Sequence, residues 1–145
     1  MLVRSHMKRI ADALELLTAQ HDEITLLLTR LQHEADGVHV LGEIADRLAT
    51  HFVCEHDLLE HLEIDEVGDD HDRFQAALES VFQTEIDAVE MPARIAAFGQ
   101  IFARHVRWQE DVVFVMLAET ISPDVLERIG TQLAKWSETS FVVAA

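Results

Sequence analysis

Apolar residues recur every three or four positions through most of this 145-residue chain, a spacing that places side chains on one face of an α-helix. Only two prolines and five glycines interrupt the pattern, and the chain has no tyrosine. Few helix breakers and few strand-forming residues favour helix over sheet. The sequence therefore predicts an all-α protein, of a size that forms one hydrophobic core.

The periodic pattern divides into four long segments and a shorter fifth. We expect helices over about residues 10–34, 40–63, 71–89, 92–120 and 123–138, with Ser122 capping the last helix and Pro123 in its first turn. Four long helices with short connections can form an up-down-up-down four-helix bundle. Residues 10–120 would form this bundle, and residues 121–145 a short additional C-terminal helix and an apolar tail. Residues 1–9 would be an N-terminal extension, either an added remnant or an alternative start before Met7.

The chain is strongly acidic, with 27 acidic and 11 basic residues and a formal net charge of −16. Such a charge repels phosphate backbones and anionic lipid surfaces, so we expect neither a nucleic acid nor a membrane as partner. No secretory signal and no membrane-length apolar run is visible, and the single Cys54 cannot form an internal disulfide. We therefore expect a cytoplasmic protein. A protein partner would use the acidic surface or the apolar tail.

Four of the nine histidines fall in the middle of the apolar stripes, one on each long predicted helix. They are His21, His51, His71 and His105. Around His105, for example, Phe98 and Met116 lie near +20° and Val112 near −20° at about 100° of rotation per residue. Four others are expected in solvent, because His33 and His39 flank the first turn and His56 and His61 fall off the stripe of the second helix.

A carboxylate accompanies the inward histidines, because Glu55 lies one helical turn after His51 on the same face. Burying imidazoles and a carboxylate in an apolar core costs free energy unless another group satisfies them. A bound metal does so, and this mixture of nitrogen and oxygen donors suits iron, zinc or manganese. A lone histidine in a core is commonly held by hydrogen bonds, but one on each of four helices favours a metal site. Cys54 is expected to pack in the core beside it.

At these residues the sequence resembles the hemerythrin family, including the hemerythrin-like HHE domains. The similar pieces, in family order, are Gln20-His21-Asp-Glu-Ile24, His51-Phe-Val-Cys-Glu55, His71-Asp-Arg-Phe74 and His105-Val-Arg-Trp-Gln-Glu110. The resemblance implies a four-helix bundle with two irons, bridged by carboxylates and an oxo or hydroxo group. It also implies that His21 and His51 bind one iron, that His71 and His105 bind the other, and that Glu55 bridges them.

Three positions depart from the family pattern. Val67 stands where hemerythrins proper have a fifth histidine, which implies a more open second iron. The fourth helix offers two candidates for its carboxylate position. Gln109, an amide, lies about +40° around the helix axis from His105, and Glu110 lies about +140° from it. We select Glu110 as the ligand, because a π-bulge would turn it inward and an amide bridges metals poorly, and we place Gln109 beside the ligands. Gln75 would either hydrogen-bond a metal-bound water or a ligand histidine, or pack against a neighbouring helix.

The resemblance implies that the protein binds dioxygen or a related small molecule, nitric oxide or peroxide, for storage, sensing or detoxification. Three alternatives use a metal: a catalase- or peroxidase-like enzyme at the same centre, an iron-responsive interaction module, and a single zinc site. A helical scaffold without metal is a further alternative. No separate acid–base residues are recognisable, so any enzyme activity would come from the metal itself.

Overall fold

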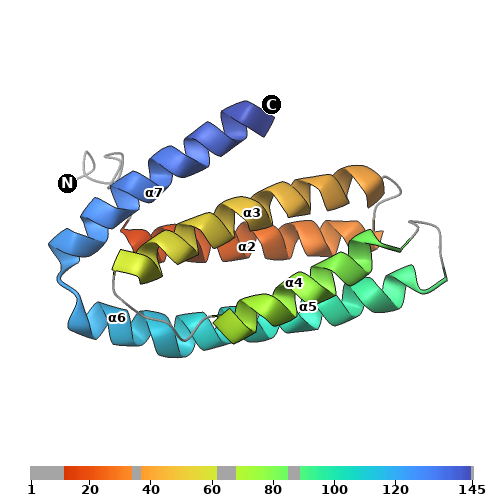
Figure 1. The fold of residues 1–145 in the computed structure, drawn as a ribbon, viewed down its shortest axis with the longest axis horizontal. Coiled ribbons are helices and arrows are strands. Elements are labelled where there is room, and N and C mark those ends of the chain that lie inside the picture. The colour runs from red at the N-terminus through yellow and green to blue at the C-terminus, as the bar shows by residue number, and fades with distance from the viewer. Residues whose placement is uncertain (1–11, 34–36, 62–67, 85–88, 145) are drawn as a thin grey trace, which may run out of the picture.

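The computed structural model describes residues 12–33, 37–61, 68–84 and 89–144 (Figure 1). At residues 38, 61, 68–71, 74 and 136–144 the description covers the backbone alone. The described elements are α2 (Ala13–His33), α3 (Gly37–His61), α4 (Gly68–Phe82), α5 (Met91–Trp108), the π-helical turn η1 (Gln109–Val113), α6 (Phe114–Thr120) and α7 (Pro123–Ala144). None of the described residues lies in a strand, which confirms the all-α prediction.

The helices pack mainly in antiparallel neighbours. Helix α2 packs against α3, α4 against α5, and α2 also against α5. Figure 1 shows these four helices side by side, with α6 continuing the line of α5, while α7 returns past α2 and α3 and contacts both. The arrangement is compatible with a four-helix bundle carrying one additional helix.

Two helix starts follow from local capping. The backbone N–H of Glu15 donates to Asp12 Oδ1 at 2.9 Å, and the N–H of Asp12 faces Glu15 Oε1 at 3.4 Å, a reciprocal pair that starts α2 at Ala13. Ile10, where we expected the helix to begin, lies outside the described residues. Ser122 occupies the predicted cap of α7, with its Oγ 3.4 Å from the N–H of Val125.

Several other helix boundaries differ from prediction, whereas the fourth predicted helix ends at Thr120 as expected. Helix α3 begins at Gly37 rather than at Val40. Helix α4 ends at Phe82 rather than near residue 89, because the Ser80 carbonyl accepts hydrogen bonds from Thr84 Oγ1 and Arg94 Nη1, while the N–H of Thr84 turns to the Val81 carbonyl. Helix α7 runs to Ala144, so most of the expected tail is helical; the docking of its side chains lies outside the described residues.

The hydrophobic core has two parts. The first part is formed by α2, α3, α4 and α5 and contains Ile24, Leu27, Leu28, Leu31, Val40, Leu41, Ile44, Leu48, Val81, Met91, Ile95, Phe98 and Phe102. The second lies toward α6 and α7 and contains Ala13, Leu17, Cys54, Leu58, Val113, Phe114, Leu117, Ile129 and Leu133. On α2 and α3 the buried apolar residues change from one part to the other around His21 and His51. The polar residues described below therefore separate two apolar regions.

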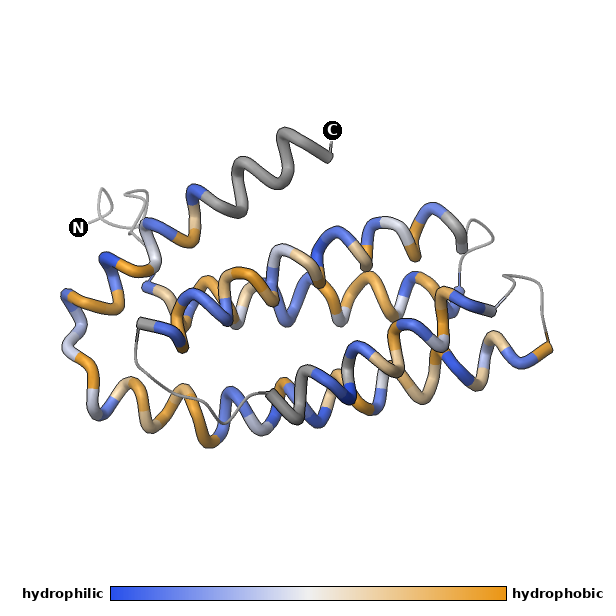
Figure 2. Tube along the Cα trace, in the orientation of Figure 1, coloured by the Kyte–Doolittle hydropathy of each residue, from blue (hydrophilic) through white to orange (hydrophobic). Residues whose placement is uncertain are grey.

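Hydrophobic and hydrophilic residues alternate along the described helices, as expected where each helix buries one face (Figure 2). Among the described residues, no helix combines the length and the apolar composition that crossing a bilayer requires.

Candidate metal centre

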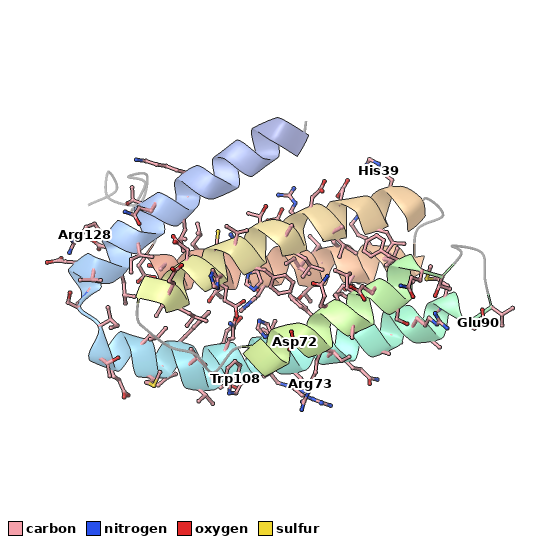
Figure 3. All side chains as sticks on the ribbon, in the orientation of Figure 1. His39, Asp72, Arg73, Glu90, Trp108 and Arg128 are labelled. Carbon is pink, nitrogen blue, oxygen red and sulfur yellow. The ribbon has the colours of Figure 1, made fainter. Side chains whose placement is uncertain are left out.

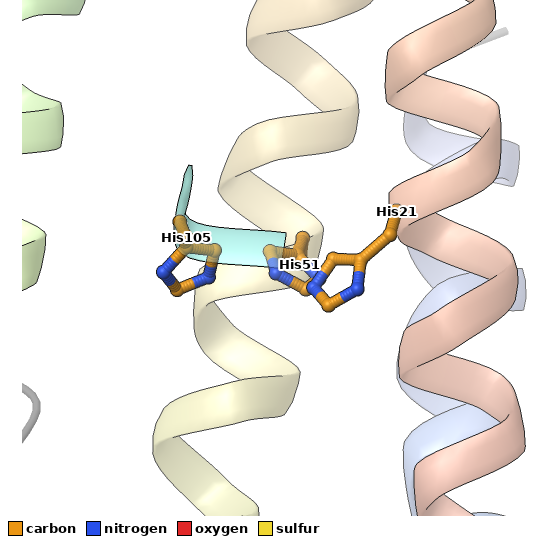
Figure 4. A group of neighbouring side chains, drawn as sticks. All are labelled: His21, His51 and His105. Atoms are coloured by element: carbon orange, nitrogen blue, oxygen red, sulfur yellow. The ribbon is translucent and has the colours of Figure 1, made fainter. Parts of the chain in front are cut away.

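Three of the four predicted histidines meet in the interior. His21 of α2, His51 of α3 and His105 of α5 point toward one another (Figure 4). The ring centroid of His21 lies 4.7 Å from that of His51 and 5.8 Å from that of His105, and one ring nitrogen of each lies within 4.8 Å of the others. The fourth residue, His71, lies in the first turn of α4, and its side chain is outside the described residues.

Burial holds the imidazole of His21 in the form that binds metals. His21 and His51 have no exposed surface, and His105 has 1%. Burial, together with the charges that His51 and His105 would carry, lowers the pKa of His21 to about 3. His21 is therefore neutral at physiological pH, and a neutral imidazole offers a nitrogen lone pair.

Glu55 lies among the three histidines. Its Oε2 is 3.1 Å from His51 Nε2 and 3.4 Å from His105 Nε2, and the residue is 1% exposed. The buried amide of Gln109 donates to Glu55 Oε1, and its Oε1 lies 2.9 Å from His21 Nε2. We call the three histidines, Glu55 and Gln109 the buried polar cluster.

The predicted π-bulge is present as η1. The Gln109 N–H still bonds the His105 carbonyl, whereas the N–H of Phe114 bonds the Gln109 carbonyl five residues earlier. This wide turn places the side chains of Gln109 and Glu110 at the two opposite nitrogens of the His21 ring. Gln109 faces His21 Nε2, and Glu110 Oε2 lies 2.8 Å from His21 Nδ1.

Gln109 lies beside the candidate ligands, where we placed it, and Glu110 lies against the ring of His21. Gln109 is 1% exposed and belongs to the buried polar cluster, whereas the Glu110 side chain is 32% exposed at its edge. Burial and the neighbouring Asp22 and Asp111 raise the pKa of Glu110. Glu110 contacts a candidate ligand, and its direct binding to a metal stays a prediction.

The wide turn also shifts the buried face of the helix by one residue. Val112 and Met116, which we placed on the inward stripe, are 57% and 44% exposed. Val113 and Leu117 are buried instead. The expectation was wrong because it carried the rotation of a regular α-helix through η1. Phe82 lies near +20° from His71 at about 100° of rotation per residue, which predicts an inward position, but it is 46% exposed at the end of α4.

The other histidines of the sequence analysis and Gln75 lie away from the buried polar cluster where their side chains are described. His33, His39 and His56 are exposed as expected, and Figure 3 shows His39 pointing away from the other helices. The side chain of His61 lies outside the described residues. Gln75 is exposed, which differs from the expectation that its amide faces the ligands or a neighbouring helix, because this side of α4 is turned to solvent.

Two residues beside the site were given no role from sequence. Gln20 Oε1 lies 2.9 Å from His51 Nδ1. The ring of Phe114 stacks on that of His21, with 5.9 Å between centroids and 4° between planes. In the sequence, only its position next to His21 indicates that Gln20 lies near the site. Phe114 was not predicted there, because the wide turn shifts the inward face of the helix by one residue after Gln109.

Three imidazole nitrogens and a carboxylate converging from α2, α3 and α5 form a donor set that fits a transition metal. The described residues therefore contain a candidate metal site, and its donors are compatible with iron, zinc or manganese. In comparisons with protein-family models, curated proteins and solved structures, no match to this chain was found.

Proposed function

We propose that this chain is a hemerythrin-like non-haem di-iron protein that binds dioxygen or a related small molecule, nitric oxide or peroxide, for storage, sensing or detoxification. The observation that carries the proposal is the convergence of His21, His51 and His105 on the carboxylate of Glu55 in the interior. In this proposal residues 10–120 form a four-helix bundle and α7 is the additional helix.

Each ligand has a proposed place. His21 and His51 hold one iron, and His105 and His71 hold the other. Glu55 bridges the two, a role supported by the approach of its Oε2 to both His51 Nε2 and His105 Nε2. Glu110 is the proposed fourth-helix carboxylate, and the wide turn at η1, which brings it to His21, supports that choice.

The surroundings favour a small ligand. Phe102 and Phe114 contact the His21 ring, and both are buried. These aromatic walls exclude bulk water from the histidines, so a molecule of two or a few atoms fits the site better than a metabolite-sized substrate. Iron in such a centre supplies open coordination positions at which a small molecule can bind.

A mononuclear zinc site is the second candidate. The observation that favours it is that the buried polar cluster has one carboxylate, Glu55, and a neutral amide, Gln109, where a second bridging carboxylate would be needed. Three histidines and one carboxylate are enough ligands for one tetrahedral zinc ion. The number and type of metal ions per chain distinguish the two candidates.

The test is anaerobic reconstitution with Fe(II), followed by counting iron per chain and recording visible spectra after azide or peroxide is added. We expect two irons and a ligand-to-metal charge-transfer band, both lost in a His51→Ala/Glu55→Ala variant. The matched control His39→Ala/Glu43→Ala changes a surface pair of the same spacing on the same helix, 68% and 34% exposed, and should keep both. An iron-loaded sample without the band would rule out the di-iron proposal.

A further inference from the structure

Gln20 holds the imidazole of His51 from the neighbouring helix. Its Oε1 lies 2.9 Å from His51 Nδ1, and the two residues come from α2 and α3. An amide oxygen accepts hydrogen bonds and cannot donate them, so in the neutral form of His51, which is the form that binds a metal, the proton is on Nδ1. The lone pair of His51 is then on Nε2, which faces Glu55 Oε2 at 3.1 Å.

The direction of the Gln20 amide is set by Cys54. The amide Nε2 lies 3.6 Å from Cys54 Sγ, and this thiol is fully buried, with Sγ 4.0 Å from the Leu133 carbonyl of α7. A thiol that donates to that carbonyl presents sulfur lone pairs to the amide N–H. Turning the amide over would place its NH₂ group against His51 Nδ1 and would require the other imidazole tautomer.

We propose that Gln20 is a positioning residue that fixes the tautomer and ring orientation of His51, with Cys54 fixing the direction of the Gln20 amide. This inference rests on the proposed metal centre and deepens it. Hydrogen bonds to the outer nitrogen of a ligand histidine orient the ring and raise its basicity, and their loss commonly weakens metal binding by about 10- to 100-fold. Gln20 would act on the metal through His51 without touching it.

The first test is titration of the metal-depleted 145-residue protein with Co(II), whose visible bands report the ligand geometry. Gln20→Met removes the acceptor while keeping the length of the side chain, and we expect about 10- to 100-fold weaker binding and altered bands. Gln20→Glu restores an acceptor and should recover binding. Gln32→Met changes an exposed glutamine on the same helix and should bind as the wild type does. Unchanged affinity and bands in Gln20→Met would overturn the proposal.

A second test needs no metal. Ring ¹⁵N spectra of the protein in EDTA report which nitrogen of His51 is protonated. We expect Nδ1–H in the wild type and in Gln20→Glu, and a tautomer mixture in Gln20→Met. If the wild type fails to bind Co(II), the metal centre is wrong, and the ring spectra still decide whether Gln20 orients His51. A wild-type His51 protonated on Nε2 would overturn the inference.

Discussion

The side-chain amide of Gln109 donates a hydrogen bond to the buried carboxylate of Glu55. The same amide presents its oxygen to His21 Nε2, so one neutral residue connects a candidate bridging carboxylate to a candidate ligand histidine. The amide satisfies one oxygen of Glu55 without adding a second carboxylate. The chemistry of the site therefore depends on position 109 being an amide rather than a carboxylate.

Gln109→Glu should have opposite effects without and with metal. In EDTA at neutral pH, two carboxylates would lie side by side in a region of low dielectric, and Glu55 would lose a hydrogen bond to its charged oxygen. We expect a loss of about 1.5–3 kcal/mol in the free energy of unfolding, measured by urea denaturation. With Fe(II) or Zn(II) added, the extra carboxylate should strengthen binding and offset this loss.

Gln100→Glu is the matched control, because Gln100 lies on α5 and is exposed. It should change the unfolding free energy by less than about 0.5 kcal/mol. Equal stability of Gln109→Glu and wild type in EDTA would contradict the role of Gln109 beside Glu55.

Metal should stabilise the fold through His51 and Glu55. A metal that binds the folded chain alone adds about 2.7 kcal/mol of stability at a free concentration 100 times its Kd. We expect Zn(II) or Fe(II) to raise the Tm of the wild type, and His51→Leu/Glu55→Leu to abolish that rise. The measurement is thermal unfolding with and without metal.

The surface pair His39 and Glu43, 68% and 34% exposed, supplies the control, since its nitrogen and oxygen lie 3.0 Å apart at the same spacing on α3. His39→Leu/Glu43→Leu should keep the metal-dependent rise in Tm. A rise that survives in His51→Leu/Glu55→Leu would place metal binding elsewhere in the chain.

Acidification should destabilise the metal-depleted protein. The pKa of His21 falls from 6.5 to about 3 on folding, so between these values the unfolded chain binds more protons than the folded one. The stability contribution is complete above pH 6.5 and decreases by roughly 1.4 kcal/mol per pH unit below it. Glu110 acts in the opposite sense, because its raised pKa favours the folded state at acidic pH.

Comparing wild type with His21→Leu isolates the histidine. Urea denaturation in EDTA from about pH 7 to pH 5 should show a shallower dependence of stability on pH in this variant. His39→Leu, which removes an exposed histidine, should keep the wild-type slope. Parallel curves for wild type and His21→Leu would show that His21 does not remain neutral in the fold.

The histidines show how far helical periodicity can predict a site. Helix α3 contains three histidines followed four residues later by a glutamate, at His39, His51 and His56. Spacing alone does not distinguish them. The apolar neighbours do, because they place His51 on the stripe of residues such as Ile44 and Leu48, and the structure buries His51 while leaving the other two exposed.

Periodicity fails where the backbone changes its period or where a contact crosses between helices. The choice of Glu110 over Gln109 as ligand predicted a wide turn in this helix. The turn shifts the inward face by one residue, which buries Val113 and Leu117, and this shift can be predicted only once the position of the turn is known. The bond from Gln20 to His51 depends on the register of α2 against α3. No pattern within a single helix contains that register.

His71→Ala tests whether the centre holds two metal ions. His71 is in α4, which packs against the helix of His105, and the proposal assigns these two histidines to the second iron. We expect the iron content to fall from two ions per chain to about one, while His21, His51 and Glu55 keep the first. The measurement is metal analysis after anaerobic loading and removal of loosely bound iron. His33→Ala, at an exposed position of α2, should leave the count unchanged. A wild type that binds one ion, and a His71→Ala variant that binds the same, would favour the mononuclear site of three histidines and Glu55.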